Sequence, residues 1–88
     1  MSADPKSYDA AVAQARLYQI QKNYAAAAKA WPDAIALRPD LSVPYVQLAL
    51  CLWRLNRLDE ARDACRKALQ LDPKDVRAAE LLENLGKP

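Results

Sequence analysis

Residues 41–55 read LSVPYVQLALCLWRL, and this stretch decides the fold of the 88-residue chain. Apolar residues recur in it at the i, i+3, i+4 and i+7 spacing of an α-helix, and they do so on two faces. The first face carries Tyr45, Leu48, Ala49 and Leu52, and the second carries Val43, Val46, Leu50 and Trp53. A helix that is apolar on two faces needs neighbours on several sides, or a partner molecule.

The composition of the whole chain favours an all-α fold. It is 52% hydrophobic, rich in Ala and Leu, and contains one Gly and no Phe or His. The 13 basic and 11 acidic residues leave a net charge of +2, which is far from the basic footprint typical of nucleic-acid binding. No apolar run approaches the length of a signal peptide or a membrane span. We therefore expect a cytoplasmic protein with no nucleic-acid or membrane partner.

Three prolines reveal an internal repeat, because Pro5, Pro39 and Pro73 are each 34 residues apart. The same offset relates several small and apolar pairs: Val12 and Val46, Ala15 and Ala49, Ala27 and Ala61, Ala30 and Ala64, Ala34 and Ala68, Leu37 and Leu71. Each repeat reads as two helices. The pattern predicts helices at about residues 7–21, 24–37, 42–55, 58–71 and 75–85.

Polar residues and prolines mark the expected helix ends. Asp4 is expected to cap the first helix, with Pro5 in its first turn, and Ser42 is expected to cap the third. Asn56 suits a left-handed residue after the third helix, and Gly86 ends the fifth.

Pro32 falls in the middle of the second helix, where it removes one hydrogen bond. We expect a kink or a local loosening there rather than two separate helices.

A helix–turn–helix period of 34 residues resembles the tetratricopeptide repeat family. The second repeat carries the pattern as Tyr45, Leu48, Ala49, Leu52, Ala61, Cys65, Ala68 and Pro73, and the first as Ala11, Gln14, Ala15, Tyr18, Ala27, Trp31, Ala34 and Pro39. The resemblance implies an α-solenoid of two repeats, at about 8–41 and 42–75, and a capping helix at about 76–86. Small residues are expected where helices approach most closely: Ala15, Ala27, Ala34, Ala49, Ala61 and Ala68.

The residue types argue against catalysis and against a metal site. The chain has no His to serve as a base, and its single Gly excludes a phosphate-binding loop. Cys51 and Cys65 are expected to be buried reduced thiols, with a disulfide between them as the alternative. We expect no enzyme, no cofactor, no metal ion and no small-molecule substrate.

The family resemblance implies a concave groove, lined by the first helix of each repeat, that binds a peptide or a partner helix. The predicted groove residues are Val12, Arg16, Gln19, Val43, Val46, Gln47, Leu50, Trp53, Arg54 and Arg77, with Asp9, Ile20 and Glu80 at further family-equivalent positions. Some members bind acidic tails of heat-shock chaperones through a Lys/Asn/Arg carboxylate clamp. The clamp positions here are Val12, Arg16, Gln47, Arg77 and Leu81, so only its Arg and Gln part is present.

Two interpretations of the apolar strip formed by Val43, Val46, Leu50 and Trp53 remain open. The strip binds a protein or peptide partner, or it is buried against a second copy of the chain. Trp53 could instead belong to the intramolecular core, if the last helix covers it.

Overall fold

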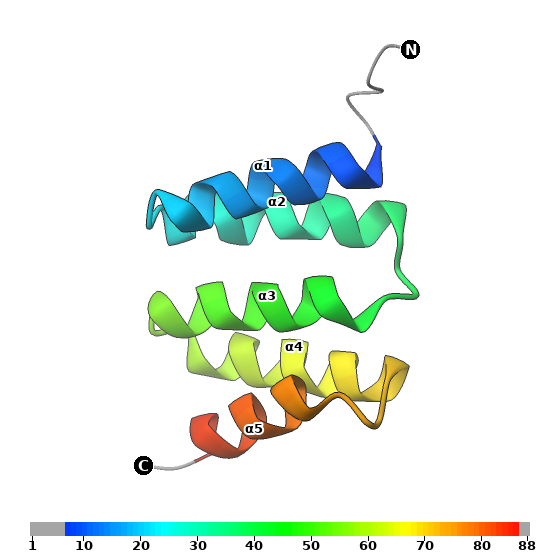
Figure 1. Cartoon of the computed structure of the whole chain (residues 1–88). Helices are drawn as coiled ribbons and strands as arrows, with labels where there is room; N and C mark the ends of the chain where they lie inside the picture. Colours follow the sequence, from blue (N-terminus) through cyan, green and yellow to red (C-terminus); the bar gives the residue numbers. More distant parts are fainter. Residues whose placement is uncertain (1–6, 87–88) are drawn as a thin grey trace.

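The computed structural model describes residues 7–86, and Figure 1 shows its helices stacked one after another from the N-terminal to the C-terminal end. The helices are α1 (Tyr8–Ile20), α2 (Tyr24–Leu37), α3 (Ser42–Arg54), α4 (Leu58–Leu71) and α5 (Val76–Leu85). Each packs against the next one in the sequence, and α3 also touches α5. The stack measures 48 × 26 × 16 Å. In the described part of the chain, the predicted all-α fold of five helices is confirmed.

The helix starts differ from the expected caps at two places. Ser7 caps α1, since its Oγ accepts a hydrogen bond from the Ala10 N–H at 3.1 Å. The predicted roles of Asp4 and Pro5 lie outside the described residues. The predicted Ser42 cap is wrong, because Ser42 is already the first residue of α3 and no side chain caps that helix. The hydroxyl of Ser42 bonds to a residue far along the chain instead, as described below.

The two repeats turn in the same way between their helices. Lys22 and Asn56, 34 residues apart, both adopt the left-handed conformation, with φ of 60° and 62°. The Lys22 N–H donates to the Gln19 carbonyl and the Asn56 N–H to the Trp53 carbonyl, each at 2.9 Å. These bonds satisfy carbonyls that a helix end leaves free. The expectation for Asn56 is confirmed.

Small side chains lie where the helices meet. All six alanines predicted at the helix contacts are 0% exposed: Ala15, Ala27, Ala34, Ala49, Ala61 and Ala68. Larger apolar side chains fill the space around them, and Trp31 is the largest one that is fully buried. A close-packed interior has no room for a larger residue at an alanine position. The repeat therefore specifies how near its helices approach.

Pro32 lies inside α2, and α2 continues through it from Tyr24 to Leu37. The expectation of one helix rather than two is confirmed, while the kink stays a prediction. Pro32 has no N–H to donate to the Ala28 carbonyl, and its side chain is exposed. Pro44 also lies in a helix, but in the first turn of α3, where no helical partner is lost, and its ring is fully buried.

Opposite effects on stability are expected for these two prolines. Pro32→Ala should restore a helical hydrogen bond and raise the free energy of unfolding by about 1–3 kcal/mol. Pro44→Ala should lower it by about 1–2 kcal/mol, because buried apolar surface is lost and the unfolded chain gains freedom. Urea denaturation followed by circular dichroism measures both. Destabilisation by Pro32→Ala would show that the proline is accommodated without loss.

Both cysteines are buried free thiols, as predicted, and the disulfide alternative is wrong. They belong to different core clusters, Cys51 with Trp31 and Cys65 with Leu52. Burial raises the pKa of each thiol to about 11. An unfolded thiol has a pKa of about 8.5, so the folded state retains these protons to higher pH than the unfolded state does.

This difference in pKa makes stability depend on alkaline pH. The thiols' contribution is fully present below about pH 8.5 and is lost as the pH rises through about 11. We expect the free energy of unfolding to fall over this interval in urea titrations under reducing conditions. The double variant Cys51→Ala/Cys65→Ala should show a shallower decline. Equal declines would assign the effect to tyrosine and lysine titration.

Candidate functional site

Two adjoining hollows follow the side of α3 that faces α5. Their volumes are about 280 and 300 Å³, and Val46 and Arg77 border both of them. The predicted groove residues that line them are Val43, Val46, Gln47, Leu50, Trp53 and Arg77. In this structure six of the ten predicted site residues thus meet along one groove, which we call the α3–α5 groove.

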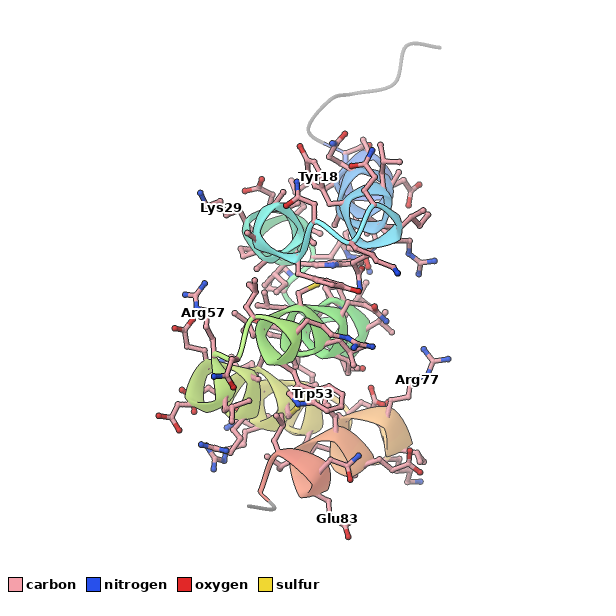
Figure 2. All side chains as sticks on the ribbon, turned by 90° about the vertical axis from the view of Figure 1, so that its left-hand side faces the viewer. Tyr18, Lys29, Trp53, Arg57, Arg77 and Glu83 are labelled. Atoms are coloured by element: carbon pink, nitrogen blue, oxygen red, sulfur yellow. The ribbon has the colours of Figure 1, made fainter. Side chains whose placement is uncertain are left out.

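The apolar part of this groove is not the continuous strip that the sequence suggests. Val43 is 47% exposed and Trp53 is 41% exposed, whereas Val46 between them is only 3% exposed. Val46 packs against Ala68 and Ala78 and offers a ligand no more than an edge. The interpretation of Val46 as part of an exposed strip is therefore wrong, because α5 covers it. The alternative that Trp53 belongs to the core is also wrong, and Figure 2 shows Trp53 between α3 and α5.

Polar side chains connect α1 to the α3–α5 groove. The indole Nε1–H of Trp31 donates to Gln19 Oε1 at 2.9 Å, and Gln19 Nε2 donates to Gln47 Oε1 at 3.2 Å. Val12, one turn of α1 away, is half-buried against the cluster that contains Trp31. Gln19 and Val12 therefore hold α1 in place next to the groove rather than line its hollows.

Three arginines lie near the groove outside any ion pair. Within residues 7–86 the ion pairs involve other arginines, on α4 and on the connections before α3 and α4, and none involves Arg16, Arg54 or Arg77. Arg54 lies over the rings of Tyr24 and Trp53, with 5.9 and 5.8 Å from its guanidinium carbon to the ring centroids. Arg16 is exposed on α1. Arg77 points into solvent on the side opposite Arg57 (Figure 2).

One side chain determines where α5 begins beside α3. Asp75 Oδ1 accepts from the Ala78 N–H at 3.2 Å and so caps α5, while Asp75 Oδ2 accepts from the Ser42 hydroxyl at 3.0 Å. At the other end of α5, Arg62 Nη1 donates to the Leu85 carbonyl at 2.7 Å. These bonds anchor both ends of α5 and thereby shape the wall of the groove.

The five clamp positions divide into two groups. Arg16, Gln47 and Arg77 present polar groups at or near the surface. Val12 is half-buried, and Leu81 is 5% exposed in the core cluster between α3, α4 and α5. Neither of these two can contribute a charge, so a complete clamp is absent.

Sequence reasoning missed Asn84 and Val76, which the structure places in the lining of the groove. A signal for both was present, because Asn84 is 34 residues after Leu50 and Val76 is 34 residues after Ser42. Extending the repeat register along the whole of α5 would have placed them on the groove side.

The largest hollow lies elsewhere, between α1 and α2, and has a volume of about 560 Å³. Alanines make up most of its lining, with Gln14, Asp33 and Leu37. No basic side chain lines it, and none of the ten predicted site residues does. It is therefore a surface distinct from the α3–α5 groove.

Two further kinds of site are missing from residues 7–86. No group of three or more His, Cys, Asp or Glu side chains is placed to hold a metal ion. No helix in this part of the chain combines the length and the apolar character that crossing a membrane requires.

The stacked helix pairs and the lateral groove define a helical-repeat binding protein. Residues 43–75 match the family model described as Tetratricopeptide repeat. The chain is a tetratricopeptide repeat protein, and as such a non-catalytic binding module.

Known proteins similar to this chain are larger than it. Sperm-associated antigen 1 of Rattus norvegicus is 31% identical over 80 residues, which are 91% of this chain and 9% of that protein. The structure described as the first TPR of Spaghetti (RPAP3) bound to HSP90 peptide SRMEEVD has a TM-score of 0.87 and 25% identity, and the match covers 94% of this chain and 66% of that one. The TPR2B domain of yeast Sti1, in a complex with pHsp70, has a TM-score of 0.86 and 27% identity, with 93% and 65% covered.

The anchoring of α5 by Asp75 can be tested through stability. Asp75→Ala removes two hydrogen bonds and should lower the free energy of unfolding by about 1–3 kcal/mol, whereas Ser42→Ala removes one and should cost about 1 kcal/mol. Glu83→Ala, an exposed position on the same helix, is the matched control and should change stability little. Urea denaturation gives the three values, and equal effects at positions 75 and 83 would contradict the anchoring role.

Proposed function

We propose that the α3–α5 groove, together with the neighbouring face of α1, binds an extended peptide segment that carries carboxylates and an apolar side chain. The observation that carries this proposal is the charge pattern around the groove. Arg16, Arg54 and Arg77 form no ion pair within residues 7–86. Arginines around a cleft give a favourable potential for acidic ligands.

The exposed apolar side chains support a ligand that has an apolar residue next to its acidic ones. Trp53 and Val43 remain accessible at the two ends of the groove, and Leu50 is half-exposed between them. Trp and Arg are the residue types that most often dominate binding energy at interfaces. Two similar structures carry the names of heat-shock peptides, and the one printed sequence, SRMEEVD, combines acidic and apolar residues. This likeness supports the ligand class.

The partial clamp predicts how the ligand is held. Arg77 and Arg16 would receive carboxylates, and the half-buried Val12 and the buried Leu81 would receive none, because they pack in the core. Affinity for an acidic peptide should therefore depend on the arginines and on Trp53.

The test measures binding of the peptide SRMEEVD and of its uncharged counterpart SRMQQVN by titration calorimetry. We expect SRMEEVD to bind and SRMQQVN to bind at least tenfold more weakly, with affinity for SRMEEVD falling as salt increases. Arg77→Ala should weaken binding by about tenfold through loss of a charge-assisted hydrogen bond.

The matched control is Arg57→Ala, which removes the same charge from the opposite side of the molecule (Figure 2). It should change affinity less than about twofold. Equal affinity for the two peptides, or equal losses in the two variants, would sink the proposal.

A second copy of the chain is the alternative occupant of the same surface. The observation that favours it is the exposure of Trp53 and Val43, since large exposed apolar side chains often mark a contact between subunits. Light scattering over a range of concentrations distinguishes the two occupants. A mass that stays monomeric at high concentration contradicts self-association, and a dimer that Trp53→Ala dissociates supports it.

A further inference from the structure

The hydrogen bonds that link Trp31, Gln19 and Gln47 have a direction that reaches the groove. They cross three helices, because Trp31 lies on α2, Gln19 on α1 and Gln47 on α3. The partners are 12 and 28 residues apart in the sequence, so tertiary packing brings them together. Each amide can in principle point either its oxygen or its nitrogen toward the next group.

Trp31 determines which orientation each amide takes. An indole N–H only donates, and Trp31 is 0% exposed, so its N–H needs a protein acceptor. Gln19 provides its oxygen to the indole, and its nitrogen is then left to face Gln47. Gln47 in turn must accept with its oxygen, because two amide N–H groups cannot bond to each other. The opposite orientation would leave two pairs of donors facing one another.

We propose that Trp31 and Gln19 together orient Gln47 so that its amide N–H groups, and not its oxygen, face the α3–α5 groove, which selects a ligand oxygen at this point. This inference rests on the proposed function and deepens it. Gln47 is partly exposed and lines the groove beside Val43 and Arg77. Among residues 7–86, its side-chain bond is the one it accepts from Gln19. Gln19 is a positioning residue, since both ends of its amide are engaged within the protein.

The chemistry of the ligand follows from this orientation. With its oxygen engaged, Gln47 offers only donors, as do the guanidinium groups of Arg77 and Arg16. A carboxylate or a peptide carbonyl of the ligand matches this set of donors, whereas a ligand N–H would meet another N–H. Donor-only lining thus favours an acidic peptide in an extended conformation with a carbonyl or a carboxylate at α3.

The direction of the bonds can be observed in the ligand-free protein. NMR of ¹⁵N,¹³C-labelled wild type detects scalar couplings across hydrogen bonds. We expect couplings from Trp31 Nε1 to the side-chain carbonyl carbon of Gln19, and from Gln19 Nε2 to that of Gln47. A coupling from Gln47 Nε2 to Gln19 would overturn the inference.

Reversing the orientation tests its effect on binding. In Gln19→Glu the carboxylate accepts from Trp31 but has no N–H, so Gln47 must turn its nitrogen toward residue 19 and show its oxygen to the groove. Affinity for SRMEEVD should fall by about tenfold or more, the usual effect of losing a hydrogen bond to a charged group. Gln21→Glu adds the same charge at the exposed end of α1 and should reduce affinity by less than about threefold.

The outcomes separate this inference from the proposed function. A larger loss in Gln19→Glu than in Gln21→Glu supports the orientation of Gln47, and equal losses overturn it because charge alone then explains them. Thermal unfolding of both variants shows that each remains folded. Failure of the wild type to bind SRMEEVD overturns the proposed function and the ligand preference with it, while the couplings still decide how Gln47 is oriented.

Discussion

Contacts through buried alanines bring the helices close enough for every other feature of this protein to exist. A methyl group is the largest side chain that fits at these positions, so the helix axes are held at a nearly fixed separation. Trp31, Leu52 and Cys65 then fill the remaining space. Because α3 contacts α2, α4 and α5, a larger residue at Ala49 would displace both the core and the groove.

The groove differs from the family's carboxylate clamp for a reason that lies in the packing. Two of its positions, Val12 and Leu81, contribute to the core between helices, and a charged side chain there would have to be buried without a partner. The cationic groups that remain are at the rim, on α1, α3 and α5. The arrangement favours a ligand bound by arginines and by contact with Trp53 rather than by a fully charged pocket.

Much of this structure could be predicted from the sequence because the 34-residue period repeats local patterns. The helices, the left-handed Asn56, the contact alanines and the buried free thiols all follow from residue type and spacing. Six predicted groove residues line the hollows beside α3. The register of the repeat carried that information, since it determines which side of each helix a residue occupies.

The sequence by itself determined the helices and their close contacts, because both depend on patterns that span a few turns or one repeat. Only the tertiary structure decided that Val46 is covered, that Ser42 bonds to Asp75, and that Trp31 reaches Gln47 through Gln19. Those features join residues 12 to 33 positions apart in the sequence or depend on how far α5 extends over α3. Neighbouring helices must be placed before a burial or a hydrogen bond of this kind has a definite partner.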